Sequence, residues 1–271
     1  MKIIDAHFHF RPEIEGFQET AKKSGHENTE KHLNTVWKEN NIVHGIVMGN
    51  MGIELKDHSY PHNMSYCIGL DSNCFHNDSD LDYFLQMTEK HFQQNNCVGL
   101  KLYPGYCPYY VYDSMYFPFF KLAENYHKPV AIHTGQTSRS DAFLKYSHPL
   151  TLDDIAAQFP EVQFVMCHFG NPWLADAAAV LSKNPNVCAD LSGILEGNPN
   201  IESFFKENSA FVNYLKMWLS YVNDYKRILF GTDWPIVNIP AYIKFISHII
   251  PQEHHESVFF ENARRIYNLK L

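Results

Sequence analysis

The sequence predicts an α/β fold in which eight parallel strands close into a single-domain TIM barrel, (β/α)8, spanning residues 1–271. The chain has 271 residues, 45% of them hydrophobic, which suits one barrel with a large core. Eight short apolar runs alternate with longer segments, and this alternation predicts parallel strands joined by right-handed crossovers. The count of eight favours a closed barrel over an open sheet, and no glycine-rich nucleotide-binding motif follows any of the runs.

The predicted strands are short runs of largely apolar residues with a period of two, bounded by turn-forming residues. In chain order they are IIDAHFHF (3–10), NIVHGIVMGN (41–50), SYCIGLDS (65–72), CVGLKLYP (97–104), PVAIHTG (129–135), QFVMCHFG (163–170), NVCADLSG (186–193) and RILFGTDWP (227–235).

Six helices are predicted from apolar residues spaced three or four apart. They cover 81–95, 114–127, 151–159, 173–183, 210–225 and 240–250. Thr151 and Asp154 resemble a capping box at the start of the third of these helices. Two polar segments, 11–34 and 50–63, are expected to be loops over the mouth of the barrel, where such folds carry their sites.

The charge balance argues against a nucleic-acid or acidic-membrane partner. The chain has 22 basic and 30 acidic residues, a formal net charge of −8, whereas both partners require clustered Lys and Arg. We therefore expect a small-molecule partner. No N-terminal signal pattern and no apolar run of membrane-spanning length is present, so the expected location is the cytoplasm. Six cysteines without CxxC spacing are expected to be reduced thiols. They are Cys67, Cys74, Cys97, Cys107, Cys167 and Cys188.

The first predicted strand carries two histidines two residues apart. Because alternate residues of a strand point to opposite faces, His7 and His9 are predicted to share one face, with Ala6, Phe8 and Phe10 on the other. The aromatic face would pack on helices, so the imidazoles would point into the barrel near its mouth and share one cation. A single buried histidine is usually a core residue, but a pair on one face favours metal binding.

Four more predicted strands contribute a polar side chain to the mouth. His133, His168 and Asp233 lie late in the fifth, sixth and eighth strands, and Lys101 is predicted to face inward from the fourth. Parallel strands of a barrel end at the same mouth, and the eighth strand neighbours the first after closure. These groups are therefore expected to meet the histidine pair and to form a divalent-metal site.

Two other polar residues in predicted strands are interpreted as structural. Asp5 is expected to form an internal hydrogen bond, and His44, early in the second strand, is expected to be a core residue.

The ordered set of motifs resembles the amidohydrolase superfamily, specifically the amidohydrolase-2 branch of metal-dependent TIM-barrel hydrolases and decarboxylases. The resemblance covers nearly the whole chain. The segments that carry it are the His7/His9 pair, GLKLYP around Lys101, VAIHTG with His133, VMCHFG with His168, FGTDWP with Asp233, and ENARRIYNL at 261–269.

The resemblance implies a divalent metal, commonly zinc, held by His7, His9 and His133 with Asp233 nearby. It implies that His168 is either a ligand of a second metal or an acid–base and substrate-orienting group.

Lys101 bears on the number of metal ions. In some branches of the superfamily a lysine on the fourth strand is carboxylated and bridges two metals. In the amidohydrolase-2 branch many members keep one metal, and the lysine is then available to bind a substrate carboxylate. We expect one strongly occupied metal site, with a second ion and carboxylation of Lys101 as the alternative.

The predicted chemistry is hydrolysis of a small ester, lactone or amide. A metal ion can lower the pKa of a bound water toward roughly 7. Asp233 would act as general base, while His168 and the metal would stabilise the developing oxyanion. Side chains at or just after strand ends are candidate substrate contacts and indicate a polar or anionic ligand. They are Arg11, Lys101, Tyr103, Arg139, Asn171 and Trp234.

Other functions remain open from the sequence. Decarboxylation or hydration of a small unsaturated carboxylic acid would use the same site. A nuclease of the related TatD type is disfavoured, because it would show basic clusters and a glutamate in place of Lys101. A catalytically silent barrel that only binds a metal or ligand is a third alternative. A homodimer surface would be formed by aromatic residues expected to be exposed, namely Tyr109, Tyr110, Phe117 and Phe119.

Overall fold

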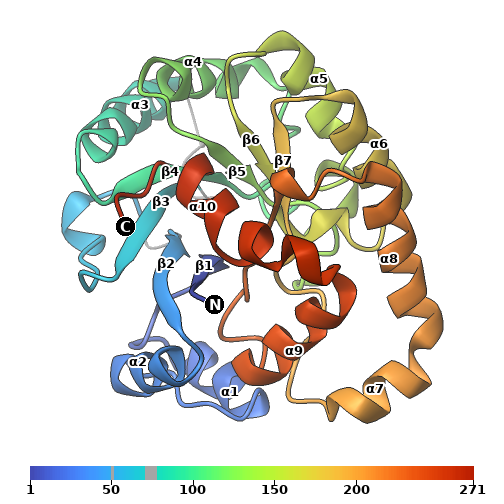
Figure 1. Ribbon diagram of the computed structural model, residues 1–271. Helices are drawn as coiled ribbons and strands as arrows, with labels where there is room; N and C mark the ends of the chain where they lie inside the picture. The colour runs from blue at the N-terminus through green and yellow to red at the C-terminus, as the bar shows by residue number, and fades with distance from the viewer. Residues whose placement is uncertain (50–51, 71–77) are drawn as a thin grey trace.

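The computed structural model describes residues 1–49, 52–70 and 78–271, and its eight parallel strands follow one another around a single sheet in chain order (Figure 1). Cys74 and the outer ends of the second and third predicted strands lie outside these residues. The strands are β1 Ile3–Phe8, β2 Ile42–Met48, β3 Met64–Leu70, β4 Cys97–Leu102, β5 Val130–Ile132, β6 Phe164–Met166, β7 Val187–Asp190 and β8 Ile228–Leu229.

The segment that follows β8 closes the barrel onto β1. The Ala6 amide donates a hydrogen bond to the Phe230 carbonyl at 3.0 Å, and the amides of Thr232 and Asp233 donate to the His7 carbonyl at 3.1 and 2.7 Å. The first and last strands are thereby joined, as the prediction of a closed (β/α)8 barrel requires.

Helices surround the strands, and the six predicted ones are present (Figure 1). They are α3 Asp78–Phe92, α4 Phe117–Asn125, α5 Thr151–Gln158, α6 Leu174–Lys183, α8 Ser209–Val222 and α9 Ile239–Ile249. Four helices were not predicted, namely α1 Glu15–Lys23, α2 Glu30–Glu39, α7 Ile201–Glu207 and α10 Asn262–Ile266. Short turns of 3-10 helix are η1 Leu55–Asp57, η2 Ser114–Tyr116, η3 Leu144–Tyr146, η4 Cys167–Gly170, η5 Tyr225–Arg227 and η6 Gln252–His254, and η7 Ser257–Glu261 is a π-helical turn.

Two local predictions were wrong. Segment 11–34 is not a simple loop, because it contains α1 and the start of α2; in α1 only Ala21 is buried, and its largely polar residues are also typical of a loop. The capping box at Thr151 does not form, since the Thr151 hydroxyl donates to the His148 carbonyl at 2.8 Å and α5 has no side-chain cap.

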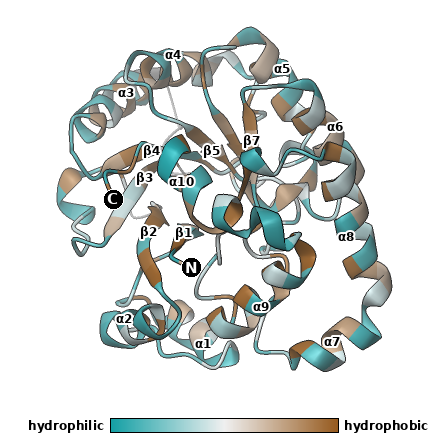
Figure 2. Cartoon of the chain, in the orientation of Figure 1, coloured by the Kyte–Doolittle hydropathy of each residue, from teal (hydrophilic) through white to brown (hydrophobic). Residues whose placement is uncertain are grey.

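The core has an outer layer between the strands and the helices and an inner layer inside the barrel. Apolar residues colour the strands between the more polar outer surfaces of the helices (Figure 2). Phe260, Ala263 and Ile266 of η7 and α10 pack with the inner layer, and α10 lies across the barrel next to the N-terminus (Figure 1). The C-terminal segment therefore covers the end of the barrel opposite the predicted site.

Strand β1 departs from the simple alternation predicted for it. Ala6 belongs to the inner layer, whereas Phe8 and Phe10 pack in the outer layer as expected. The pairing of β1 with β2 shifts register between Asp5 and Phe8, so a residue is displaced from the strict period of two.

The structure also bears on two predictions, one about exposed aromatic residues and one about membrane-spanning segments. Phe119 is fully buried, so it was wrongly placed on an exposed aromatic surface. In the described part of the chain, no helix combines the length and apolar character needed to cross a membrane.

Candidate metal centre

The ends of β1 and β8 bring together His7, His9 and Asp233. The Nε2 atom of His9 lies 3.2 Å from Oδ1 of Asp233, and the Nε2 atom of His7 lies 3.5 Å from the same oxygen. One ligand atom from each of the three residues lies within 4.8 Å of the others. Asp233 has a positive φ of 61°, an uncommon conformation for a residue other than glycine and one that recurs at functional sites.

Hydrogen bonds on the far side of each ring determine which nitrogen is free. Nδ1 of His9 lies 3.0 Å from the Met48 carbonyl, and Nδ1 of His7 lies 2.8 Å from Oδ2 of Asp190. Both partners can only accept, so each Nδ1 carries the hydrogen, and a ring without a second hydrogen presents a lone pair at Nε2. Oδ1 of Asp233 therefore lies opposite the Nε2 atoms of both rings, and a divalent cation between these three atoms would be held by all of them.

His168 and His133 form a second pair beside the first. Nδ1 of His168 lies 3.1 Å from the Ser192 carbonyl, so this nitrogen donates, and Nε2 accepts from Nδ1 of His133 at 3.1 Å. His133 is therefore also left with a lone pair at Nε2. The rings of His7 and His168 are 4.8 Å apart between centroids, so the four histidines form one cluster.

The fit of a metal ion can be tested on the buried polar atoms. The Nε2 atoms of His7 and His133 are both buried and have no hydrogen-bond partner within the described ranges. Buried polar groups are rarely left without a partner, and a neutral imidazole with a free Nε2 is a common metal ligand. The ligand atoms of His7, His9 and Asp233 lie within 4.8 Å of one another and fit a divalent ion. His133 is not in this group and contacts His168, which lies beside it.

Asp190, the last residue of β7, links the two pairs and was not predicted as a site residue. One oxygen, Oδ2, accepts from His7, while Oδ1 accepts from the amides of His168 at 2.9 Å and Ser192 at 3.1 Å and from the Ser192 hydroxyl. The signal was present, because Asp190 is a polar residue at the end of an apolar strand, as His133 is.

The electrostatics keep Asp190 and Asp233 charged and His7 and His133 neutral. Burial raises the pKa of Asp190 and Asp233, but the histidines around them outweigh this effect and hold both pKa values well below the ordinary range. Burial lowers the pKa of His7 to about 4 and that of His133 well below its ordinary value, in the latter case with help from His168. Charged carboxylates and neutral imidazoles are the forms that bind metals.

Comparison with known proteins identifies the family of the chain. Residues 77–269 match the family model described as Amidohydrolase. The chain belongs to the amidohydrolase family. This confirms the family inferred from the sequence motifs.

Several proteins with solved structures share the barrel. A TIM-barrel protein of Bordetella bronchiseptica is 18% identical with a TM-score of 0.73 and 99% of each chain covered. An amidohydrolase of Burkholderia multivorans with bound zinc is 14% identical, with a TM-score of 0.69 and coverage of 99% of this chain and 100% of that one. The 2,6-dihydroxybenzoate decarboxylase from Rhizobium is 16% identical, with a TM-score of 0.67 and full coverage of both chains. The family thus includes hydrolases and decarboxylases.

One curated relative matches over a shorter stretch. Protein fluG of Emericella nidulans is 37% identical over 68 residues, which is 25% of this chain and 8% of that protein. The chain therefore spans only a small part of fluG.

In this member of the family, His168 does not lie in a strand as predicted. Strand β6 ends at Met166, and His168 stands in η4 with φ 60° and ψ 18°. The chain turns sharply after the strand because the His168 amide bonds to Asp190. Gly193 makes room for this arrangement, since a Cβ atom there would lie 2.8 Å from Oδ2 of Asp233 and 3.3 Å from Nδ1 of His168.

The predicted substrate contacts on β1 and β4 lie at different depths. Arg11 is partly exposed and lies 3.5 Å from a carboxylate oxygen of Glu13. Tyr103 is buried, and its hydroxyl donates to the carbonyls of Met48 and Gly49, both at 3.2 Å. Lys101 faces the interior as predicted, but it is 1% exposed and its Nζ contacts a thiol inside the barrel.

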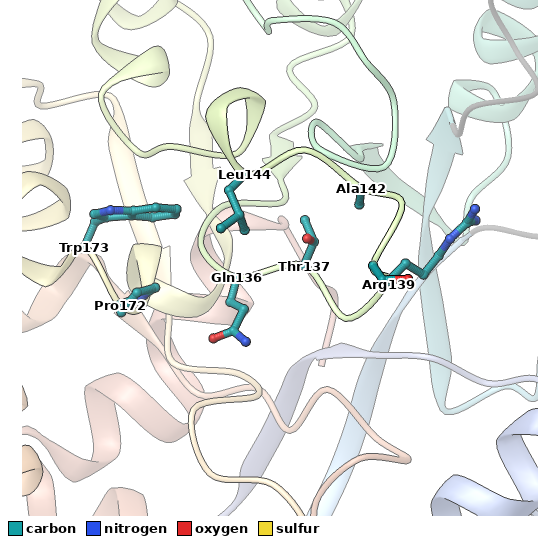
Figure 3. Close-up of a pocket in the computed structure, with 8 residues that line it drawn as sticks. Gln136, Thr137, Arg139, Ala142, Leu144, Pro172 and Trp173 are labelled. Atoms are coloured by element: carbon teal, nitrogen blue, oxygen red, sulfur yellow. The ribbon is translucent and has the colours of Figure 1, made fainter.

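The predicted contacts on the later loops are divided between the rim and the core. Asn171 is half-buried, and its carbonyl accepts from the Gln136 amide at 2.9 Å. Arg139 is exposed and paired with Asp141; it borders a pocket of about 280 Å³ between the loops that follow β5 and η4 (Figure 3). Trp234 was wrongly predicted as a substrate contact, because it is fully buried.

The two residues interpreted as structural form internal hydrogen bonds. Asp5 accepts from the amide of Thr232 at 2.9 Å and from its hydroxyl at 2.6 Å, which confirms the predicted internal hydrogen bond. His44 is buried, with Nε2 2.9 Å from the Ser65 hydroxyl.

Proposed function

We propose that this chain is a metal-dependent hydrolase that acts on a small ester, lactone or amide. The observation that carries the proposal is the convergence of the His7 and His9 lone pairs on the Asp233 carboxylate. His7, His9 and Asp233 would hold the ion, with His133 as the neighbouring donor. When bound, a divalent ion such as zinc supplies Lewis acidity and lowers the pKa of a coordinated water.

Asp233 is proposed as the general base. Its Oδ1 faces the two histidines of β1, while Oδ2 lies 4.0 Å from Nδ1 of His168. Oδ2 is therefore the oxygen available to accept a proton from an attacking water and to return it to the leaving group. The surrounding histidines hold the pKa of Asp233 well below its usual range, so the carboxylate is charged at neutral pH.

His168 is proposed to orient the substrate at the metal centre. Its ring is fixed at both nitrogens, by Ser192 on one side and His133 on the other. A group held in this way loses little freedom when the reaction proceeds. Arg11 near the mouth supports a polar or anionic small molecule as the substrate, with one metal ion favoured over two.

Substitution of the proposed base tests this function. Asp233→Asn keeps the volume but loses the base and a charged ligand, so we expect turnover of lactone, ester and amide panels to be largely abolished and metal content to fall. Asp224→Asn, a carboxylate paired with Arg227 on the surface, is the matched control and is expected to retain activity. Wild-type rates in Asp233→Asn would contradict the proposed role.

A non-hydrolytic reaction is the second candidate. The fold similarity to a 2,6-dihydroxybenzoate decarboxylase supports decarboxylation or hydration of a small unsaturated carboxylic acid at the same residues. Measuring carbon dioxide release and ring opening side by side on matched carboxylate and lactone substrates separates the two reactions. Release of carbon dioxide without any hydrolysis would favour the second.

A further inference from the structure

A lysine and a cysteine are in close contact inside the barrel. Nζ of Lys101, in β4, lies 2.8 Å from Sγ of Cys167, which directly follows β6. Lys101 is 1% exposed and Cys167 is fully buried. Alternate strands of a barrel contribute inward side chains to the same layer, which explains why residues from β4 and β6 meet although β5 lies between them.

The contact is unusual as a purely structural one. Among the described residues, the Lys101 Nζ atom has the Cys167 thiol as its hydrogen-bond partner and forms no ion pair with a carboxylate. The ring of Tyr103 lies 5.2 Å away. A thiol is a weak acceptor, so a buried lysine head group is poorly compensated here. The pair is better explained by chemistry between its two atoms.

We propose that Lys101 and Cys167 form an oxidation-dependent covalent bridge through one oxygen atom, Nζ–O–Sγ, with dioxygen as the oxidant. One N–H bond, the S–H bond and the O–O bond break, and an N–O and an O–S bond form. The two hydrogens leave with the second oxygen atom as water. Nitrogen and sulfur each lose two electrons, and the two oxygen atoms together gain four.

The geometry favours a bridging oxygen over other oxidation products. The two atoms are too far apart for a direct N–S bond but are within reach of a single intervening atom without backbone movement. The five described cysteines are free, so a disulfide does not compete at Cys167. Burial excludes bulky reductants, whereas dioxygen is small and apolar.

The position of the bridge connects it to the metal centre. Sγ of Cys167 lies within 4.8 Å of ligand atoms of both His7 and Asp190. Oxidation of the pair would therefore modify the layer directly beneath a proposed ligand. This inference concerns a modification site and does not depend on which reaction the metal centre performs.

Peptide mass spectrometry of the full chain tests the bridge. One sample is kept anaerobic with reductant, the other is equilibrated with air, and both are denatured, alkylated and digested with trypsin. In the aerated sample we expect peptide 91–121, uncut after Lys101, linked to peptide 146–183, whose one cysteine is Cys167. The mass of the linked product is expected to equal the sum of the two peptide masses plus one oxygen atom and minus two hydrogen atoms.

Two variants serve as controls. Cys167→Ser is expected to lose the linked peptide, whereas Cys188→Ser, a buried cysteine on the neighbouring strand β7, is expected to retain it. Full alkylation of Cys167 and normal cleavage after Lys101 in the aerated wild-type chain would overturn the proposal. A linked product in which trypsin still cleaves after Lys101 would also overturn the proposal, because it indicates a disulfide from Cys167 to Cys97 or Cys107. This holds even if an oxidised methionine gives that product the same added oxygen mass.

Discussion

Replacing Asp190 by Asn is expected to weaken metal binding by changing the tautomer of His7. Oδ1 of Asp190 accepts three hydrogen bonds, from the His168 amide and from the amide and hydroxyl of Ser192. In the Asp190→Asn variant the side-chain amide oxygen would keep these three donors, which forces the NH2 group to the position of Oδ2, facing Nδ1 of His7. Two donors then oppose each other, and His7 relieves the conflict by moving its hydrogen to Nε2.

The lone pair of His7 is thereby lost from the metal centre. Loss of a hydrogen-bond partner behind a metal-binding histidine typically costs about 10- to 100-fold in metal affinity, or about 1.4 to 2.7 kcal/mol. Zinc titration against a competing chelator measures the affinity, and 15N NMR of the histidine rings reports the tautomer directly. Asp153→Asn removes a carboxylate that accepts from Lys183 and Asn184 on the surface and serves as the control. Wild-type zinc affinity in a folded Asp190→Asn variant would refute the reasoning.

Three further predictions address the centre and the surrounding fold. His7→Ala is expected to lose the metal in elemental analysis, and retained stoichiometric zinc would show that the histidine is structural. Gly193→Ala is expected to weaken zinc binding by pushing on Asp233 and to cost about 1–2 kcal/mol in unfolding free energy from its left-handed backbone; Gly197→Ala, also at positive φ but with no neighbour within 4 Å, should show only the second effect. Burial lowers the pKa of His91 to about 4, so on acidification His91 is protonated in the unfolded chain at a higher pH than in the folded chain. Denaturant titrations should therefore show the free energy of unfolding falling as pH drops from about 6.5 to 4. An equally steep fall in His91→Gln would contradict that assignment.

The fold and several residues of the metal centre could be predicted from local sequence patterns. A run such as IIDAHFHF predicts a strand with inward histidines, and the position of Asp233 in the last strand predicts that it meets them once the barrel closes. The same rule applies to Asp190, which also ends an apolar strand, but strand position alone does not show that its carboxylate accepts a hydrogen bond from His7.

Side chains beyond the strand ends were predicted less well for a physical reason. Period-two patterns report which face of a strand a residue occupies, but not which distant segment covers it. The ring of Trp234 lies 4.9 Å from that of His26 and 6.4 Å from that of His32, both in segment 11–34. That segment was expected to be a loop, so its packing over Trp234 was not predicted.

The location of the metal centre across the joint between β1 and the segment after β8 has a consequence for folding. His7 and Asp233 are joined through backbone bonds at this seam, and the closure of such distant parts of a chain is entropically slow. An ion held by His7 and Asp233 would connect the two sides of this seam. It would stabilise the closed barrel in proportion to its affinity, so that loss of the ion and opening of the seam become one coupled event.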